Sequence, residues 1–479
     1  MNYSIIRYVT GHTMLLEGAL MLPACVVSII YGESAAIALA LSAALCAVVG
    51  LLIKPRRLGN EKFFAKEGYV TVALCWIVFS IMGSLPFLFS GSITNPIDAV
   101  FEAVSGFTTT GASILNDIES LPRGILFWRS FTHWIGGMGV LVFLLTLLPM
   151  SGGSHMNLMK AESPGPSVSR LAPKVQTTAK ILYGIYIWLT IIEIVLLLLG
   201  RMPLFDALTL TFGTAGTGGF GILNDSIASY STYSQVIITI FMILFGINFN
   251  AFYFILIKHF KEALAMEEVK AYLLVIAASV LIITANIAHL FDNVLVAFQQ
   301  AAFQVASIIT TTGFSTTDFN EWPEISRTIL VMLMFIGACA GSTGGGMKVS
   351  RFLIWFKTII KEIRLYLHPK SVKQIKMDGK TVAPEVVRSA NVYLVVYMII
   401  FAASILLIAV DNFDSTTNFT AVAATLNNIG PGLNQVGPMS NFSGFSNFST
   451  LVLTFDMLAG RLELFPLLLL FSRDTWKKF

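Results

Sequence analysis

The sequence predicts an all-α polytopic membrane protein, in which two leading helices precede four similar pore-forming units around one central pore. Three observations support this fold class. The 479-residue chain is 55% hydrophobic and 12% charged, whereas soluble domains carry about 25% charged residues. Ten apolar runs are each long enough to cross a bilayer, which takes about 20 residues. One short phrase recurs four times, each time between two of these runs.

The ten apolar runs set the order of the predicted spanning helices. We expect helices near residues 12–31, 34–53, 67–90, 124–149, 179–200, 234–259, 269–290, 327–360, 389–410 and 449–472. Only Arg7 precedes the first run, and no small-residue cleavage site separates it from the second. We therefore interpret the first run as a retained helix rather than a signal peptide.

Basic residues orient the predicted helices. If the N-terminus and every alternate connection lie on one side, that side carries all but five of the 31 lysines and arginines. The five exceptions are Arg123, Arg129, Arg201, Arg327 and Arg461. Because positive charge marks the cytoplasmic side, both termini are predicted to be cytoplasmic. The outer connections carry acids such as Asp98 and Glu102, which would concentrate cations at the mouth, although positive-inside bias alone gives a similar distribution.

Four connections on the outer side are too long and too apolar for ordinary loops, and they carry the repeated phrase. They span residues 91–123, 201–233, 291–326 and 411–448. Each is predicted to contain a short helix that descends into the membrane and a loop that returns. The resulting organisation is a two-helix extension at 1–60 and pore units at 61–150, 151–262, 263–368 and 369–479.

The repeated phrase is closest between the first and third units. Residues 99–111 read AVFEAVSGFTTTG and residues 301–313 read AAFQVASIITTTG, which match at seven of thirteen positions. Looser copies end at Gly219 (FGTAGTGG) and at Gly430 (ATLNNIG). One TTTG segment alone would be interpreted as a helix-breaking turn, but four copies on one predicted face favour a shared pore.

The starts of the short helices are predicted from two acidic residues. Asp98 and Asp206 each lie thirteen positions before the glycine of their loop, and we expect each to cap its helix. Gln300 and Thr417 take that place in the other copies, where the capping signal is weaker.

The residue types of the four loops favour cation binding. Irregular backbone at membrane depth is tolerated only where it is buried in protein or lines water. A cation that leaves water needs oxygens in place of its hydration shell, and rings of backbone carbonyls and threonine hydroxyls provide them. Glycine permits the backbone angles that such rings require, and the negative C-terminal ends of the short helices favour a cation. The predicted ion-binding residues are Thr108, Thr109, Thr110, Gly111, Gly216, Thr217, Gly218, Gly219, Thr310, Thr311, Thr312, Gly313, Asn427, Asn428, Ile429 and Gly430.

In chain order, the loops GFTTTGAS, GTAGTGGFG, IITTTGFST and LNNIGPG resemble the selectivity-filter loops of the TrkH/TrkG potassium-uptake subunits, within the Trk/Ktr/HKT superfamily. The resemblance covers essentially the whole chain, including the two leading helices. The second and fourth loops depart from Thr-Thr-Thr-Gly, so the filter is not chemically fourfold.

A further segment, FIGACAGSTGGGM at residues 335–347, interrupts the eighth apolar run. It resembles the intramembrane loop of the family, which implies a gate beneath the filter. Residues 337–347 include five glycines and cannot hold a stable helix; close packing between helices is the alternative explanation. The predicted gate residues are Gly337, Gly341, Ser342, Thr343, Gly344, Gly345, Gly346 and Arg461.

Arg461 lies in the last predicted spanning helix. An arginine near mid-membrane costs roughly 2.5–3.5 kcal/mol on insertion scales, so it needs a partner or water. The resemblance implies that Arg461 projects into the pore below the filter, where its charge raises the barrier to cations. The alternative is a structural ion pair with Glu463 or Asp456.

The resemblance implies potassium uptake across the bacterial inner membrane, with K+ as the transported ion and no permanently bound cofactor. It also implies a homodimer regulated by a cytosolic nucleotide-binding ring protein (TrkA-like), for which the basic segment 357–388 is a candidate docking surface. That segment also fits simple positive-inside topology. No nucleic-acid partner is expected, and no convergent nucleophile, base or metal set indicates an enzyme.

Two other functions stay open. Na+-permeable members of the superfamily often carry serine where Gly111 stands here, so glycine in all four loops favours K+. A coupled transporter of an organic solute would usually have an inverted repeat, whereas these four units share one orientation.

Overall fold

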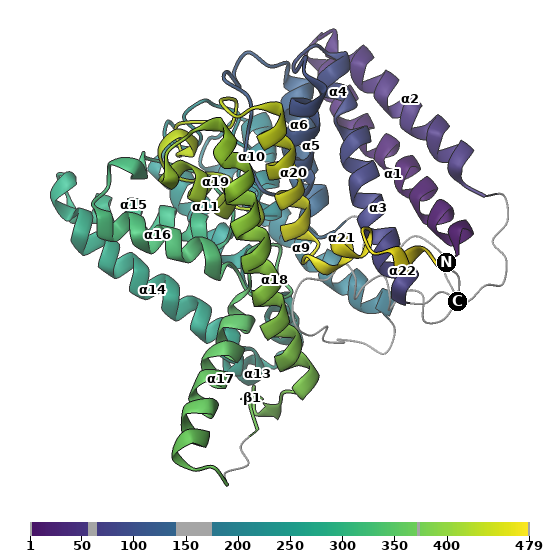
Figure 1. The fold of residues 1–479 in the computed structure, drawn as a ribbon. Coiled ribbons are helices and arrows are strands. Elements are labelled where there is room, and N and C mark those ends of the chain that lie inside the picture. The colour runs from purple at the N-terminus through teal and green to yellow at the C-terminus, as the bar shows by residue number, and fades with distance from the viewer. Residues whose placement is uncertain (1, 56–64, 140–174, 371–373, 478–479) are drawn as a thin grey trace.

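Two long N-terminal helices lie beside a ring of four similar helical units (Figure 1). This arrangement is seen in a computed structural model that describes residues 2–55, 65–139, 175–370 and 374–477. It confirms the predicted fold class.

Each of the four units contains a long first helix, a short pore helix and a second helix. The first helices are α3 (Ala65–Gly83), α9 (Val175–Leu199), α14 (Glu267–Ile287) and α18 (Pro384–Ile408). The pore helices are α5 (Pro96–Phe107), α10 (Leu204–Gly216), α15 (Val294–Ile309) and α19 (Ser415–Leu426). The second helices are α6 (Arg123–Gly137), α11 (Thr232–Phe245), α16 (Glu324–Ile336) and α20 (Asn447–Arg461).

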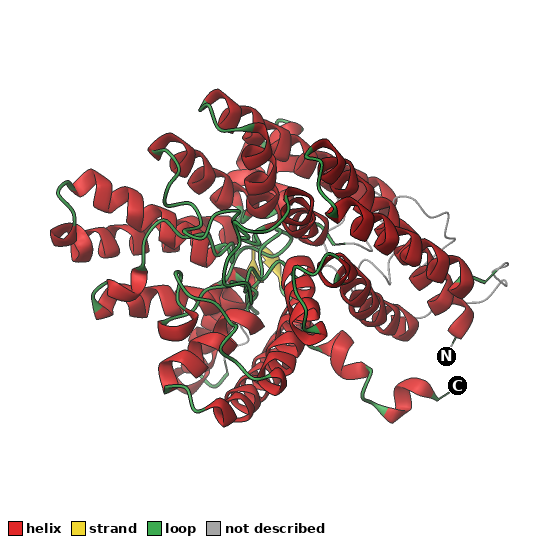
Figure 2. Ribbon diagram, turned by 90° about the horizontal axis from the view of Figure 1, so that it is seen from above, coloured by secondary structure: helices red, strands yellow, loops and turns green. Residues whose placement is uncertain are grey.

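The units close into a ring because each second helix packs against the pore helix of the next unit. Helix α6 contacts α10, α11 contacts α15, α16 contacts α19, and α20 of the last unit contacts α5 of the first. Seen from above, the loops converge in the middle of the surrounding helices (Figure 2). The repeated segments therefore belong to one four-part ring.

The two leading helices, α1 (Tyr3–Ile30) and α2 (Ala35–Ile53), form a hairpin beside the first unit. A Cβ added to Gly11 would lie 2.8 Å from the Gly50 carbonyl oxygen, and one added to Gly18 would lie 2.8 Å from the Ala43 carbonyl oxygen. Small residues thus allow the two backbones to approach closely, as is common in membrane helices. Helix α1 also packs against α3 and α6.

The remaining elements are short helices, turns and one hairpin, apart from the longer α17. They are α4 (Leu85–Phe89), α12 (Phe249–Leu256), α13 (Phe260–Ala265), α17 (Val349–Leu367), α21 (Phe465–Leu469), α22 (Arg473–Trp476), the 3-10 turns η1 (Ala288–Leu290), η2 (Phe319–Glu321), η3 (Ala409–Asp411) and η4 (Asn434–Val436), and the antiparallel strands β1 (Lys376–Met377) and β2 (Lys380–Thr381). Helices α13 and α17 and strand β1 project together from one end of the bundle (Figure 1). Lys357 of α17 pairs with Glu267 of α14 and donates to the Lys376 carbonyl at 2.7 Å, which ties this projection to the third unit.

The predicted count of ten spanning helices is not confirmed. Among the described residues, six helices are long and apolar enough to cross a membrane, and α11 with α12 forms a further span bent by 92°. The second helices of the last three units are bent or interrupted, which explains part of the difference. Helix α16 ends at Ile336 and α17 begins only at Val349, while α20 ends inside the predicted span 449–472. Part of the predicted span 124–149, and the unit boundaries near 60 and 150, lie outside the described residues.

The first two pore helices begin earlier than predicted. Asn95 caps α5 and accepts a hydrogen bond from the Ile97 amide at 3.0 Å. Helix α10 follows Pro203, which makes no side-chain cap bond. Asp98 and Asp206 therefore lie inside the first turn, and the prediction that they cap these helices is wrong. Both carboxylates still lie near the positive end of a helix dipole.

The fourth pore helix has an acidic cap. The Asp414 carboxylate accepts hydrogen bonds from the amides of Thr416 and Thr417, both at 3.0 Å. The Thr417 hydroxyl also donates to this carboxylate, and these bonds hold the pKa of Asp414 below its ordinary value. Because the pKa is depressed in the folded protein, the resulting stabilisation is present at neutral pH. It is lost only as the pH falls below about 4.

Asp414→Ala is expected to lower the free energy of unfolding by about 1 kcal/mol, the usual cost of a lost N-cap. The measurement is the midpoint of thermal unfolding in detergent at neutral pH, and the difference from the unmodified protein should shrink in acid. Asp292→Ala is the matched control, because Asp292 is exposed and the cap of α15 is its neighbour Asn293. Equal midpoints for Asp414→Ala and the unmodified protein at neutral pH would contradict the capping role.

Candidate functional site

The four pore helices end in the same way. After each helix, one amide bonds to the carbonyl three residues earlier, and the next amide bonds to the carbonyl five residues earlier. The pairs are Thr109–Gly106 and Thr110–Ser105, Thr217–Thr214 and Gly218–Gly213, Thr311–Ile308 and Thr312–Ser307, and Asn428–Thr425 and Ile429–Ala424. This is the Schellman arrangement, which requires a left-handed residue just after the helix.

Left-handed backbone recurs at two positions in every loop. The first position holds Thr109, Thr217, Thr311 and Asn428, with φ of 56°, 55°, 60° and 55°. The second holds Gly111, Gly219, Gly313 and Gly430, with φ of 78°, 75°, 86° and 101°. Positive φ is uncommon for threonine, so the shared Schellman bonds must hold it in place. The same two left-handed positions thus recur in all four loops, which share one backbone conformation.

The four loops interlock in cyclic order. A Cβ added to Gly111 would lie 2.0 Å from the Gly218 carbonyl oxygen of the second unit. The equivalent Cβ distances are 2.0 Å from Gly219 to the Thr312 oxygen, 2.1 Å from Gly313 to the Ile429 oxygen, and 2.8 Å from Gly430 to the Thr110 oxygen. Each glycine thus faces a carbonyl of the next unit, and the last unit returns to the first. A side chain at any of the four would meet backbone oxygen.

The threonines of the first and third loops are fully buried. The Thr108 hydroxyl lies 2.8 Å from the Thr110 hydroxyl, and the Thr310 hydroxyl lies 2.7 Å from the Thr312 hydroxyl. By contrast Gly111, Gly219 and Gly313 are partly exposed. Solvent therefore reaches the loops at these glycines, above the buried threonines.

The second loop departs from the threonine pattern because helix α6 occupies the space. A Cβ added to Gly216 would lie 2.2 Å from the His133 carbonyl oxygen. One added to Gly218 would lie 2.2 Å from Cγ of the His133 ring. Only glycine fits at these two positions.

The fourth loop departs from the pattern because its asparagines bind neighbouring elements. Asn427 donates to the Tyr397 hydroxyl at 2.9 Å. Asn428 donates to the Thr110 hydroxyl of the first loop and to the Met457 carbonyl, each at 2.9 Å. The Asn428 amide thus joins the fourth unit to the first.

The Gly-rich loop between α16 and α17 (residues 337–348) contacts the repeated loops. We name them after their predicted roles: the gate loop, and the filter loops at residues 108–111, 216–219, 310–313 and 427–430. The Gly345 amide donates to the Thr311 hydroxyl at 2.6 Å, and the Gly346 amide donates to the Asn427 carbonyl at 3.0 Å. A Cβ added to Gly344 would lie 2.8 Å from the Thr310 carbonyl oxygen. The predicted gate glycines therefore lie against the segments predicted to bind ions.

The other predicted gate residues turn the loop back on itself. A Cβ added to Gly337 would lie 2.6 Å from the Gly345 carbonyl oxygen. The Thr343 hydroxyl donates to the Phe245 carbonyl at 3.2 Å, and the Ser342 hydroxyl bonds within the loop. Gly341, at the far end, is exposed.

Arg461 connects the gate loop to the first unit. Its guanidinium donates to the Thr343 carbonyl at 3.0 Å, and to the Gly136 and Gly137 carbonyls at 2.5 and 2.9 Å. These two glycines end α6, so one side chain spans the gate loop and the deep end of the first unit.

The alternative partners predicted for Arg461 bind other groups. Glu463 forms an ion pair with Arg351, and Asp456 accepts a hydrogen bond from Ser404 at 2.7 Å. The guanidinium of Arg461 lies instead among carbonyl oxygens.

Two more basic residues, which were not among the predicted gate residues, donate to carbonyls of the gate loop. Lys348, at φ 75° and only 2% exposed, donates to the Gly344 carbonyl. Arg351 donates to the Met347 carbonyl at 3.0 Å. Positively charged side chains thus donate to two carbonyl oxygens of the gate loop.

A buried carboxylate ties the gate loop to the start of α17. Glu268 at the start of α14 is 4% exposed and accepts the Ala340 amide at 2.6 Å and the Ser350 amide at 3.1 Å. Asn248 also donates to it at 3.4 Å. In sequence Glu268 is one of two ordinary acids in a first helical turn, so only the fold reveals this contact.

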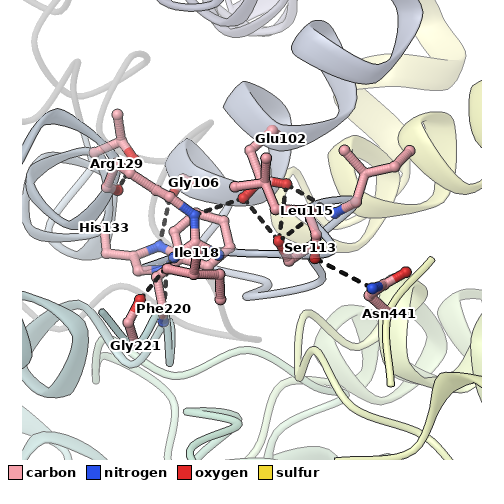
Figure 3. Close-up of polar contacts among 12 residues, drawn as sticks. Glu102, Gly106, Ser113, Leu115, Ile118, Arg129, His133, Phe220, Gly221 and Asn441 are labelled. Atoms are coloured by element: carbon pink, nitrogen blue, oxygen red, sulfur yellow. Dashed lines mark hydrogen bonds and ion pairs between the residues drawn. The ribbon is translucent and has the colours of Figure 1, made fainter. Parts of the chain in front are cut away.

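A second buried carboxylate lies behind the first filter loop (Figure 3). Glu102 on α5 is fully buried and pairs with Arg129 of α6 at 2.6 Å. It also accepts the Ile114 amide at 2.9 Å and the Ser113 hydroxyl at 3.1 Å. The prediction that Glu102 helps to concentrate cations at the mouth is therefore wrong.

Two signals pointed to this buried pair. Arg129 is one of the five basic residues that break the charge asymmetry, and Glu102 is an acid within an otherwise apolar phrase. A basic residue on the predicted outer side and an acid in an apolar segment suggest an ion pair. The sequence does not show which acid binds which base.

A polytopic helical bundle with four re-entrant segments that meet at one axis defines a membrane transport protein. Residues 34–478 match the sequence model of the TrkH family, described as a cation transport protein. This chain belongs to the TrkH family.

Individual relatives agree with that membership over their full length. The chain is 35% identical to the Trk system potassium uptake protein TrkH of Salmonella typhimurium, and 32% identical to TrkG of Escherichia coli, with 100% of each chain covered. The crystal structure of the potassium transporter TrkH from Vibrio parahaemolyticus superposes with a TM-score of 0.89, at 32% identity and 100% coverage of both chains.

Proposed function

We propose that this protein takes up K+ across a bacterial inner membrane through a filter formed by the four interlocked loops. The cyclic contact between the glycine of each loop and a carbonyl of the next carries the proposal. Its relatives are named as potassium uptake proteins. K+ is the transported ion and no permanently bound cofactor takes part.

The filter works by replacing water around the ion. Backbone carbonyls of the sixteen predicted residues, from Thr108 to Gly111 and their counterparts in the other loops, supply the oxygens. The pore helices end at these loops, so their partial negative charge adds to the attraction. Neutral carbonyls bind the ion less tightly than a charged side chain would, so the ion can leave the filter.

The gate loop closes the path below the filter. Contacts of Gly344, Gly345 and Gly346 with the filter loops support this role. Arg461 and Lys348 add positive charge there, which raises the barrier to a cation. Opening requires this loop to leave its contacts.

The charge asymmetry of the chain supports cytoplasmic N- and C-termini and outward-facing filter loops. We further propose a homodimer regulated by a TrkA-like cytosolic nucleotide-binding protein that docks near residues 357–388. Glu267 bonds the hairpin residue Asp378 there, while the next residue, Glu268, holds the gate loop. A protein that docks on the hairpin could therefore act on the gate loop through the adjacent residues Glu267 and Glu268.

Growth on limiting K+ tests this function. A bacterium that lacks its own K+ uptake systems is expected to grow when it makes this chain together with its regulatory partner. Failure to grow with the chain present in the membrane would contradict K+ uptake. Growth rescue together with equally rapid Na+ uptake would instead favour a Na+-permeable member.

Glu268→Ala is expected to increase K+ flux in the absence of the regulatory partner by about tenfold. Removing a charged acceptor of buried hydrogen bonds costs about 1.5–3 kcal/mol, and here that cost falls on the closed arrangement of the gate loop. Glu268→Gln keeps an acceptor oxygen and should have a smaller effect. K+ flux in proteoliposomes is the measurement.

Glu362→Ala is the control for this prediction, because Glu362 is an exposed acid on α17 of the same unit. It should leave the flux unchanged. Equal flux in Glu268→Ala and unmodified protein would exclude the carboxylate as a fastening of the gate.

A further inference from the structure

The second filter loop has no side chain where the other three loops have one. The residue before the filter glycine is Thr110, Thr312 or Ile429 in those loops, and Gly218 in the second. The His133 ring from α6 fills the space instead, since a Cβ added to Gly218 would lie 2.2 Å from its Cγ and 2.3 Å from its Nδ1. The imidazole thus takes the place of a filter side chain.

Hydrogen bonds hold this ring in one orientation (Figure 3). His133 Nε2 lies 3.2 Å from the Phe220 amide nitrogen, and Nδ1 lies 2.7 Å from the Gly106 carbonyl oxygen. Because a backbone amide can only donate, Nε2 is the acceptor and Nδ1 carries the hydrogen. The fully buried ring therefore joins the first pore helix to the second filter loop.

Arg129, one turn before His133 on α6, forms a buried ion pair with Glu102. The pair binds the segments that follow the first and second filter loops. The Arg129 guanidinium donates to the Gly221 carbonyl at 2.8 Å and lies 3.6 Å from the centre of the Phe220 ring. Its partner Glu102 holds the amide of Ile114, just after the first filter glycine. The segments that leave the first and second filter loops are thus tied to one helix.

His133, Arg129 and Glu102 lie behind the point at which the first two filter loops touch. The Gly218 carbonyl oxygen faces Gly111 of the first loop, and the His133 ring lies against Gly218. Discrimination between K+ and Na+ depends on the spacing and freedom of such oxygens. The three atoms nearest to an added Cβ at Gly218 all belong to the His133 ring.

We propose that His133, positioned by the Arg129–Glu102 pair, serves as the missing side chain of the second filter loop and sets the discrimination of K+ over Na+ at the Gly218 carbonyl. This inference rests on the proposed function. His133 is a positioning residue, because it acts through the carbonyl and not on the ion.

A double-mutant cycle between His133 and Gly218 tests the proposal. His133→Ala empties the space, and Gly218→Thr adds the side chain of the first and third loops but collides with the ring. Threonine suits the backbone there, since φ of Gly218 is not positive. Each single variant should raise the ratio of Na+ to K+ permeability by at least about threefold, within the usual range for coupled neighbours. The double variant should return most of the way to the unmodified ratio.

The ratio comes from reversal potentials in proteoliposomes of the full chain, so it does not depend on how much protein is active. Glu324→Gln is the control, because it removes the carboxylate of an exposed ion pair with Arg327 on α16. An unchanged ratio in His133→Ala, or no recovery in the double variant, would overturn the proposal.

A variant that fails to fold does not remove the test. Glu102→Asp keeps the charge of the buried pair and shortens its reach, and it should also raise the ratio. If Glu102→Asp has the same ratio of Na+ to K+ permeability as the unmodified protein, the pair does not position His133. If the unmodified protein conducts no K+, the proposed function fails. If the unmodified protein is selective and its His133 variants are equally selective, only the inference on His133 fails.

Discussion

Replacing Gly313 with alanine is expected to reduce K+ uptake more than about tenfold, which a change of 1.4 kcal/mol in the barrier suffices to produce. Gly313 has a φ of 86°, and a Cβ there would lie 2.1 Å from the Ile429 carbonyl oxygen and 2.9 Å from Cδ of Pro431. Left-handed backbone alone costs about 1–2 kcal/mol for other residues. The collision also displaces a carbonyl of the fourth loop. The measurement is the initial rate of K+ uptake per amount of protein in the membrane.

Gly91→Ala separates backbone strain from the collision. Gly91 has a φ of 72° and no atom within 4 Å of an added Cβ, so it carries the same conformational cost without a contact. Uptake through this variant should stay near the unmodified rate. Equal uptake in Gly313→Ala and Gly91→Ala would contradict the assignment of Gly313 to the filter.

Arg461→Ala is expected to open the gate in the absence of the regulatory partner and to raise K+ flux at least about tenfold. The side chain makes three hydrogen bonds to carbonyls of the gate loop and of α6. Bonds of charged groups contribute about 1.5–3 kcal/mol each in favourable cases, so their loss favours release of the loop. Removing the positive charge also lowers the barrier to a cation. K+ flux in proteoliposomes measures the combined effect.

Arg461→Lys separates the two contributions. Lysine retains the charge but lacks the planar fork that spans Thr343, Gly136 and Gly137. We expect a flux between those of the alanine variant and the unmodified protein. If Arg461→Ala gave no more flux than the unmodified protein, Arg461 would have no part in closing the gate.

The repeated loops show how far sequence patterns reach. Four phrases that end in Gly111, Gly219, Gly313 and Gly430 predicted one ring, and the structure places these glycines in equivalent contacts. The prediction succeeded because each loop repeats the same backbone conformation, and positive φ at its second left-handed position is a local demand that glycine meets without steric cost. The ionic roles of these residues stay predictions, and so do the unit boundaries.

Other predictions failed where several signals compete locally. Asp98 and Asp206 seemed to be helix caps, but Asn95 and Pro203 precede those helices. The positions of Asp98 and Asp206 fit either place, because caps and first-turn acids favour the same end of the helix.

By itself the sequence determined the all-α membrane class, the fourfold repeat and the glycines that each loop requires, because hydropathy and backbone conformation are properties of short segments. Only the tertiary structure decided which charges meet. It paired Glu102 with Arg129, set Glu463 against Arg351, placed Glu268 on the gate loop and put the His133 ring in the space beside Gly218. Such contacts join residues that are distant along the chain, and their energy depends on distance and burial, which no local pattern records.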